Sequence, residues 1–357
     1  MQLGDIATYI NGYAFKPIDR GNEGLPIIRI QDLTGNAYDL GYYNGKYPEK
    51  IEINNGDILI SWSGSLGVYV WNGGKALLNQ HIFKVVFDKV DIDRQYFVYS
   101  VRYKLNEMTR KTHGATMKHI VKKDFDATLI PYPSIQEQEK IAIKLDKIEK
   151  IIGDRQQELI LLDNLIKARF VELFGDPKVN PFGWDTTLVG DVVASCETGW
   201  SGNGTQRKKR NGEIAVLKVS AVTKGYFIPD ECKVLDDQKS IKKYVYPKAG
   251  DLLFSRANTR EMVGATAVIT KDYPEYILPD KLWKIRFLGK ANVWYMKYVL
   301  SSESIRSIFS SVSTGTSGSM FNVSMDKFKS IKVPLPPIER QQQFAIFVEE
   351  VTKSKVV

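Results

Sequence analysis

The sequence contains the same ordered series of short patterns twice, and this duplication limits the folds that the 357-residue chain can adopt. Each series opens with an apolar residue before Gly-Asp, at Leu3–Ile6 and again at Val189–Val192. Each closes with a proline-rich segment, Ile130–Pro133 and Val333–Pro337. Proline cannot continue a central strand but suits the first turn of a helix, so both segments predict a strand that ends where a helix begins. We therefore expect two similar domains, a number that also suits the chain length.

Three further patterns recur in the same order between these ends. The first is a β-branched run with one basic residue, at Ile27–Thr34 and Val216–Thr223. The second is a Gly-Asp turn before an apolar run, at Gly56–Ser61 and Gly250–Ser255. The third is an apolar-polar run, at Leu78–Val85 and Leu278–Ile285. A turn before a short apolar run predicts a buried strand. We expect an α/β (α+β) fold in which each domain has mixed β-sheets.

A long segment without proline separates the two copies. From Ile135 to about Phe174 it has one glycine, and its apolar residues follow a heptad seam with a polar step at Arg155: Ile141, Leu145, Ile148, Ile152, Leu159, Leu162, Ile166 and Leu173. The alternative is an ordinary amphipathic helix on a globular core, but about 40 residues at about 1.5 Å each extend about 60 Å. Such a length favours a coiled-coil helix between domains, ended by Gly175–Lys178.

A second helix is expected to follow the second proline-rich segment. It carries a short apolar seam made of Ile338, Phe344, Phe347, Val348 and Val351. The chain ends at Val357, so we expect about half of the equivalent helix and incomplete pairing between the two helices. The expected domains are residues 1–133, the central helix 134–176, the second domain 177–336 and the incomplete distal helix 337–357.

Composition and charge restrict the partners and the compartment. A net charge of +9 and a pI near 9.2 favour a polyanionic partner, because cations that neutralise phosphates release counterions. The sequence lacks an apolar stretch long enough to span a membrane and a secretory signal, so we expect a cytoplasmic protein without membrane contact. Two cysteines and three histidines give no zinc-site spacing, and we expect no metal.

The order of globular unit, long helix, similar globular unit and second helix resembles the specificity subunits of Type I restriction-modification systems. The segments that carry the resemblance span the whole chain: Leu3–Ile6, Gly56–Leu59, Gly114–Ile120, Phe125, Ile130–Pro133, Phe174–Pro177, Gly250–Leu253 and Val333–Pro337. The resemblance implies two target recognition domains, each reading one half of a split site in double-stranded DNA. It implies helices that set the distance between half-sites and dock modification (methyltransferase) subunits. S-adenosylmethionine, ATP and Mg are then expected on the modification and restriction (motor/nuclease) subunits, with no cofactor on this chain.

Side chains that could contact DNA cluster in loops at equivalent places of the two copies. Base edges are recognised by amide, guanidinium, hydroxyl and methyl groups, and Arg and Asn suit guanine and adenine. In the first copy the candidates are Ser61, Trp62, Ser63, Ser65, Asn79, Gln80, His81, Thr112, His113, Thr116, Lys118 and His119. In the second copy they are Arg207, Lys208, Lys209, Arg210, Ser255, Arg256, Asn258, Thr259, Arg260, Lys281, Thr314, Thr316 and Ser317.

Each of these candidates has a plainer alternative. The loops after the two Gly-Asp strands could be ordinary solvated turns, and His81 could be a hydrogen-bonded core histidine. Lys118 and His119 could be simple surface charges, and the basic run Arg207–Arg210 could be a solvated stretch without a partner.

The sequence lacks the motifs that an enzyme of this kind would need. Leu335–Ile338 has the two prolines of an adenine methyltransferase motif but neither the amide nor the aromatic residue that holds a flipped base. A phosphate-binding Gly-x-x-x-x-Gly-Lys loop does not occur. The adjacent acids Asp230 and Glu231 point to opposite faces of a strand and cannot share a metal. We expect a non-catalytic subunit, and the alternative is a coiled-coil scaffold without sequence-specific DNA binding.

Overall fold

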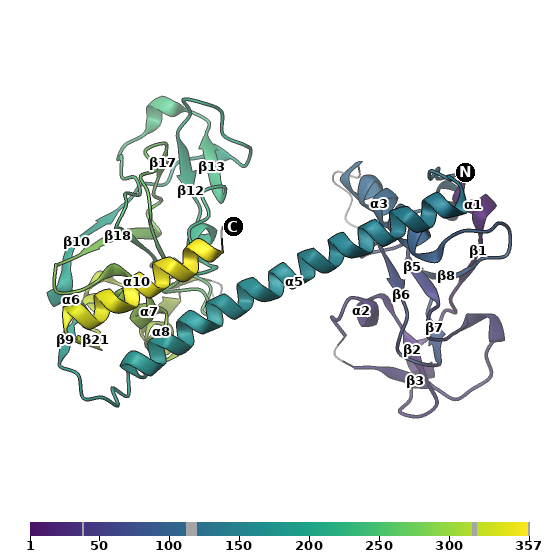
Figure 1. The fold of residues 1–357 in the computed structure, drawn as a ribbon, viewed down its shortest axis with the longest axis horizontal. Coiled ribbons are helices and arrows are strands. Elements are labelled where there is room, and N and C mark those ends of the chain that lie inside the picture. Colours follow the sequence, from purple (N-terminus) through teal and green to yellow (C-terminus); the bar gives the residue numbers. More distant parts are fainter. Residues whose placement is uncertain (38, 112–119, 316–319, 356–357) are drawn as a thin grey trace. The chain divides into compact units, whose positions relative to one another are not determined.

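The computed structural model describes residues 1–37, 39–111, 120–315 and 320–355. The chain divides into two compact units, unit 1 (Met1–Arg155) and unit 2 (Gln156–Val357) (Figure 1). Helix α5 (Ile135–Phe174) supplies its N-terminal half to unit 1 and its C-terminal half to unit 2. The predicted long helix is therefore confirmed, and so is the α+β class, because both units combine sheets with helices.

Unit 1 is built around two four-stranded sheets. The first is antiparallel and has the order β1 (Thr8–Asn11), β8 (Ile82–Val86), β5 (Ile58–Ser61) and β6 (Gly67–Val70). The second has the order β3 (Gly41–Tyr43), β2 (Leu25–Ile28), β7 (Ala76–Leu78) and β4 (Glu52–Ile53), and its β2–β7 pair is parallel. The helices are α1 (Leu3–Ile6), α2 (Ile30–Leu33), α3 (Arg94–Lys111) and α4 (Lys122–Asp126).

Unit 2 repeats this plan and adds small sheets. Its antiparallel sheet has the order β10 (Val193–Thr198), β18 (Leu282–Phe287), β14 (Leu252–Ser255) and β16 (Thr266–Val268). Its second sheet has the order β11 (Gly204–Thr205), β13 (Cys232–Leu235), β12 (Ala215–Leu217) and β17 (Tyr276–Ile277), with β12 and β17 parallel. The small sheets are β15 (Ala257–Asn258), β20 (Phe321–Asn322) and β19 (Thr314–Gly315), and β21 (Lys332–Pro334) with β9 (Thr186–Leu188). The helices are α6 (Val189–Val192), α7 (Val293–Ser301), α8 (Glu303–Val312), α9 (Met325–Lys329) and α10 (Ile338–Ser354).

The two proline junctions are held in the same way in both units. Gln138 and Gln341, in the first turns of α5 and α10, are buried, and their amide groups donate to the carbonyls of Pro133 (2.9 Å) and Pro336 (2.7 Å). Their side-chain carbonyl oxygens accept from the backbone amides of Asp93 and Asn292, which lie just before α3 and α7. Each glutamine satisfies polar groups at the junction that would be costly to bury unpaired. The duplicated sequence pattern is therefore a duplicated structural joint.

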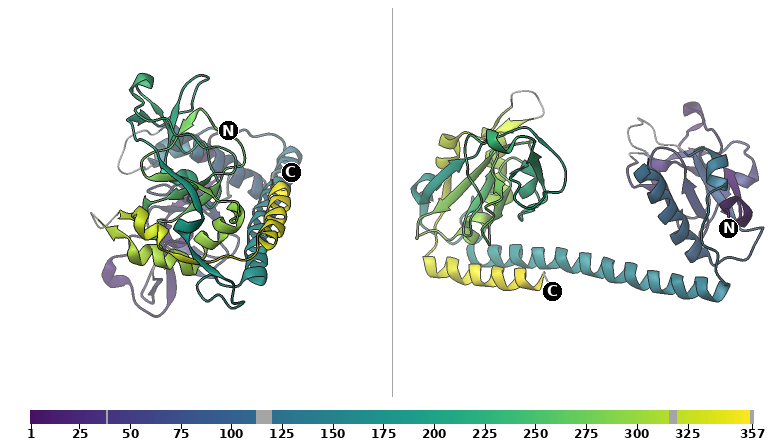
Figure 2. Two further views of the ribbon diagram at one scale, coloured as in Figure 1. Left: turned by 90° about the vertical axis from the view of Figure 1, so that its left-hand side faces the viewer. Right: turned by 90° about the horizontal axis from the view of Figure 1, so that it is seen from above.

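Helix α10 packs antiparallel to the C-terminal half of α5 (Figure 2). The Phe344 ring lies 5.5 Å from that of Phe170 and 5.7 Å from that of Phe174, and further along Lys355 pairs with Asp163 at 2.6 Å. The seam of α10 is thereby covered, since Phe344 is 0% exposed.

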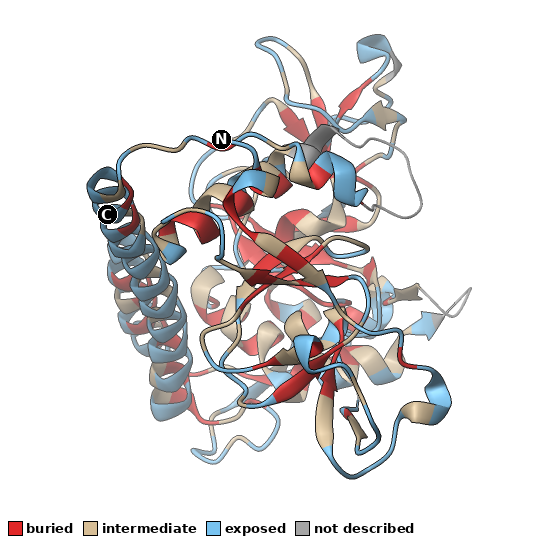
Figure 3. Ribbon diagram, turned by 90° about the vertical axis from the view of Figure 1, so that its right-hand side faces the viewer, coloured by how far each residue is buried: buried red, intermediate tan, exposed pale blue. Residues whose placement is uncertain are grey.

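The N-terminal half of the α5 seam is open instead. Ile141, Ile148 and Ile152 are 38%, 51% and 52% exposed. Much of the long helix is accordingly coloured as exposed in Figure 3. The predicted heptad seam is thus closed most fully over the turns of α5 that α10 reaches, while in unit 1 helix α5 lies against α3 through Ala142, which is buried, and Asp146, which accepts from Tyr99 at 2.7 Å. Among the described residues, no helix is long and apolar enough to cross a membrane.

Candidate nucleic-acid interface

Two glycines at equivalent places bring the loops of each unit together. A Cβ on Gly12 would lie 2.0 Å from the Asn79 carbonyl oxygen, and one on Gly199 would lie 1.8 Å from that of Leu278. This contact joins the end of β1 to the end of β7 in unit 1, and the end of β10 to the end of β17 in unit 2. Only glycine leaves room for it. The next residues, Tyr13 and Trp200, then donate their backbone amides to the carbonyls of Leu78 and Leu278.

In unit 1 the loop after β5 is tied to two other segments. The Trp62 amide donates to the His81 carbonyl (3.2 Å), and the Trp62 carbonyl accepts from the Ile120 amide (2.8 Å). The indole Nε1 donates to Asn11 Oδ1 at 3.2 Å, and the ring meets the imidazole of His81 edge-on at 4.9 Å. The structure therefore brings the predicted 61–65 and 79–81 segments together, next to Ile120.

The turn from residue 79 to residue 81 presents polar side chains to solvent. Asn79 Oδ1 accepts from the Gln80 amide at 2.9 Å and so stabilises the turn, whereas Gln80 and His81 are exposed. The alternative of a core histidine at position 81 is wrong. His81 also adopts a left-handed backbone conformation, with φ of 73°, which few residues other than glycine enter.

The serines that begin the two loops lie below the surface. Ser61 and Ser255 are 0% exposed, and their hydroxyls donate to the carbonyls of Ser65 (2.5 Å) and Ala257 (3.5 Å). They shape the loops from inside, so neither side chain is available to DNA in this structure. Ser63 is half-buried and Ser65 is exposed.

In unit 2 the equivalent loop is tied by equivalent backbone bonds. The Arg256 amide donates to the Lys281 carbonyl (3.1 Å), and the Arg256 carbonyl accepts from the Val323 amide (2.9 Å). Arg256 Nε also donates to the Asp280 carbonyl at 2.9 Å, and Asp280 itself is bonded through its carboxylate to Ser201. The predicted residues Arg256 and Lys281 are therefore neighbours in space.

The small β15–β20–β19 sheet joins two more of the predicted segments. Asn258 lies on β15 and Thr314 on β19, and both strands pair with β20. The Asn258 amide donates to Ser255 Oγ (3.3 Å) and its Oδ1 accepts from the Thr259 amide (2.9 Å), so this side chain holds the loop. The Arg260 guanidinium lies 4.7 Å from the centre of the Phe321 ring. Thr259, Arg260 and Thr314 are exposed.

The basic run Arg207–Arg210 is partly neutralised within unit 2. Arg207 forms a bidentate pair with Glu213, with both distances 2.8 Å, and lowers the pKa of that carboxyl to about 2. The Lys209 ammonium lies 5.6 Å from the centre of the Tyr276 ring, while Lys208 and Arg210 are exposed. Arg207 is exposed too, but its guanidinium is engaged with Glu213, so Lys208 and Arg210 are the exposed cations of this run that lie outside that bidentate pair.

Several predicted residues lie outside the described part of the chain. They are Thr112, His113, Thr116, Lys118, His119, Thr316 and Ser317. Sequence reasoning in turn missed Asn11 and Asp280, which accept from the predicted side chains of Trp62 and Arg256, and Ser201, which donates to Asp280. The signal that could have found Asn11 and Ser201 is their position in the sequence, within two residues of Gly12 and Gly199.

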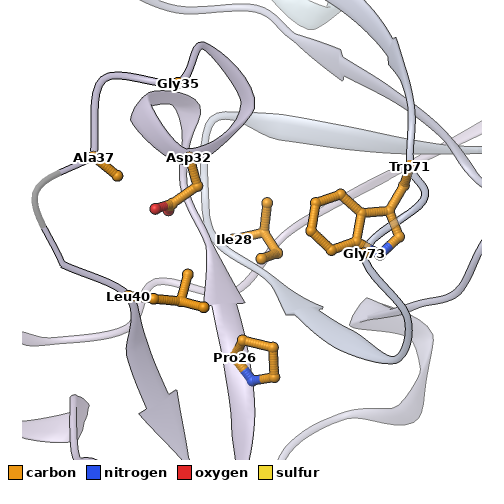
Figure 4. A pocket seen from close by; sticks show the side chains of 8 residues that line it. All are labelled: Pro26, Ile28, Asp32, Gly35, Ala37, Leu40, Trp71 and Gly73. Carbon is orange, nitrogen blue, oxygen red and sulfur yellow. The ribbon is translucent and has the colours of Figure 1, made fainter.

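A pocket of about 380 Å³ opens beside the second sheet of unit 1 (Figure 4). Its lining includes Ile28, Leu40, Asp32 and Trp71. Asp32 is paired with Arg29 at 3.0 Å, and Trp71 Nε1 donates to the Gly74 carbonyl at 2.6 Å. Both polar groups are used within the protein, so the pocket offers mainly an apolar wall.

Comparison with known proteins connects this architecture to one family. The family model described as the Type I restriction modification DNA specificity domain matches residues 1–161 and 181–356. The MjaVIII specificity subunit of Methanocaldococcus jannaschii is 26% identical over 97% of this chain and 84% of its own length. The EcoBI specificity subunit of Escherichia coli is 29% identical over 170 residues, which are 47% of this chain and 35% of that protein.

A solved structure agrees at the level of the fold. The Type I restriction-modification S subunit from M. genitalium superposes with a TM-score of 0.54 and 12% identity, over 99% of this chain and 89% of that one. The family model covers both copies of the repeat, and the fold comparison covers the helix between them. This chain therefore belongs to the family of Type I restriction-modification DNA specificity proteins.

Proposed function

We propose that this chain is the specificity subunit of a Type I restriction-modification complex and that each unit reads one half of a bipartite site in double-stranded DNA. The observation that carries the proposal is that each unit has a loop cluster. In unit 1 it consists of the loop after β5 and the 79–81 turn, and in unit 2 of the loop after β14, Lys281 and the small β15–β20–β19 sheet. Equivalent backbone bonds hold different side chains in the two clusters. Because the backbones match and the side chains differ, the two units are suited to different half-sites. A subunit of this kind recognises the target and leaves catalysis to its partners.

The loop cluster has the chemistry that DNA recognition needs. Exposed hydroxyls and cations, such as Thr259, Arg260 and Thr314, suit phosphate and base-edge contacts. The net charge of +9 adds attraction for the DNA backbone that does not depend on sequence.

The helices fit the role of a spacer and docking platform for modification subunits. Helix α5 is 40 residues long, and its N-terminal half presents Ile141, Ile148 and Ile152 to solvent. Contiguous apolar surface of this kind is typical of protein interfaces. In this proposal the modification subunits carry S-adenosylmethionine, a restriction subunit carries ATP and Mg, and the complex works in the cytoplasm.

A binding assay across a salt series tests the proposal. The full chain is mixed with the modification subunit from the same system and a DNA library, and the affinity is measured between about 50 and 200 mM salt. A subunit that contacts several phosphates should lose affinity steeply, by about 10³-fold or more for six or more contacts. Absent or salt-independent binding would instead favour the non-enzymatic scaffold.

A further inference from the structure

The geometry points to one pair of positions in each unit as the determinant of base preference: 62 with 81 in unit 1, and 256 with 281 in unit 2. This inference rests on the proposed function and deepens it. In both units the backbone amide of the first residue donates to the carbonyl of the second, from Trp62 to His81 at 3.2 Å and from Arg256 to Lys281 at 3.1 Å. The pairs are thus structural equivalents that carry different side chains.

A second backbone bond fixes the first member of each pair. The carbonyls of Trp62 and Arg256 accept from the amides of Ile120 and Val323, at 2.8 and 2.9 Å. Each first residue is therefore held between two segments that are distant in the sequence. Because this frame is the same in both units, a difference in preference has to come from the side chains.

The unit 2 pair is cationic and partly fixed in place. Arg256 Nε donates to the Asp280 carbonyl at 2.9 Å, which uses one of the five guanidinium N–H donors. A guanidinium positioned in this way loses less conformational entropy when it binds. Arg and Lys side chains donate to guanine O6 and N7 in the major groove. We therefore assign this pair to a G·C base pair in the half-site of unit 2.

The unit 1 pair combines an aromatic face with an exposed imidazole. Trp62 is fixed through its bond to Asn11, and its edge-on contact orients His81. One face of the indole is stacked on Phe83 at 5.7 Å, and the remaining surface of the half-buried ring offers an apolar contact to a thymine methyl group. The exposed imidazole nitrogens can hydrogen-bond to the edge of adenine. This pair is therefore assigned to an A·T base pair in the half-site of unit 1.

The backbone of His81 is an independent sign of function. Its φ of 73° places a non-glycine residue in the left-handed region, which is unfavourable unless the surroundings enforce it. Strained residues of this kind concentrate at functional sites. A turn with no further role would be better served by glycine, so the presence of histidine at this position points to a use of its side chain.

The test uses the complete complex. The complex methylates a library of randomised DNA, and sequencing of the methylated molecules gives the recognised motif. Arg256→Ala/Lys281→Ala should reduce the preference for one G·C pair by about 10- to 100-fold in one half-site and leave the other half-site unchanged. Trp62→Arg/His81→Lys should shift one position of the opposite half-site from A·T to G·C. Lys233→Ala removes an exposed cation on β13 and should leave both half-sites unchanged.

Each result has a counterpart that overturns the inference. A double variant that changes both half-sites, neither half-site, or a position that is not G·C would show that the assignment is wrong. Thermal melting of each variant checks that both units are folded. If the wild-type complex methylates no bipartite motif, the proposed function itself fails, which is a different outcome from an unchanged motif in the variants.

One further variant separates recognition from a structural role of His81. His81→Gly relieves the left-handed strain, so the melting temperature should rise while the preference in the half-site of unit 1 falls. A rise in melting temperature with an unchanged preference would mean that His81 serves the turn alone and would overturn its assignment.

Discussion

Replacing Phe344 by alanine tests whether the aromatic cluster at the α5–α10 junction holds unit 2 together. Phe344 is 0% exposed, and its ring lies 5.2 to 5.7 Å from the rings of Phe170, Phe174 and Tyr298. Truncating a buried phenylalanine typically costs about 3–5 kcal/mol, because transfer energy is lost and a cavity remains. The loss of three ring contacts favours the upper part of this range. We expect unit 2 to lose about 4 kcal/mol.

The internal repeat supplies the matched control. Ile141 stands at the position of α5 that corresponds to Phe344 in α10, since the two helices align at the constant offset of their proline junctions. Ile141 is 38% exposed, so Ile141→Ala removes only partly buried surface and leaves no closed cavity. Its cost should stay near 1 kcal/mol, well below the range for a fully buried isoleucine.

Hydrogen exchange followed by mass spectrometry measures the two units separately. In Phe344→Ala the slowest amides of unit 2 should exchange about 10²- to 10³-fold faster, because each 1.4 kcal/mol corresponds to about a factor of ten. Unit 1 should keep its wild-type rates. Two results would refute the argument that α10 closes a helix-packing core in unit 2 that the corresponding turn of α5 lacks in unit 1. One is an increase in exchange rate below tenfold in unit 2 of Phe344→Ala. The other is an increase in unit 1 of Ile141→Ala as large as that in unit 2 of Phe344→Ala.

The remaining predictions concern pH and two glycines. Burial lowers the pKa of Lys297 to about 8 from its ordinary value of 10.5. Between these values the unfolded chain binds more protons, so the stability of unit 2 should rise with pH across this window. Lys297→Met should therefore stabilise unit 2 by about 1–3 kcal/mol at pH 7, and melting curves at pH 7 and pH 10 should show the gain shrinking at the higher pH. A gain that does not depend on pH would contradict this cause. Gly199→Ala would place a Cβ 1.8 Å from the Leu278 carbonyl and should destabilise unit 2 by about 3 kcal/mol or more, measured by melting. Gly153→Ala, inside α5 with no atom within 4 Å of its Cβ, should instead stabilise the helix by about 0.5–1 kcal/mol; a loss there would show that the position has an unseen constraint.

Patterns that are local in the chain were sufficient for the elements and their repetition. The heptad spacing and the absence of proline predicted a helix from 135 to about 174, and α5 spans Ile135–Phe174. The Gly-Asp turns before apolar runs predicted the strands that became β5 and β14. These features depend on propensities of neighbouring residues, so the sequence by itself determines them.

Contacts between distant residues were decided by the tertiary structure alone. The position of Ser61 directly after an apolar strand cannot reveal that its side chain is buried, because burial depends on the loop that folds over it. Asn258 has the chemistry to read adenine, yet its amide group is used by Ser255 and Thr259. Similar apolar spacing on α5 and α10 gave unequal surfaces, because Phe344 meets Phe170 and Phe174 while Ile148 remains exposed. The sequence thus determined which elements form and that they form twice, whereas packing between residues far apart in the chain decided which side chains remain available to a partner.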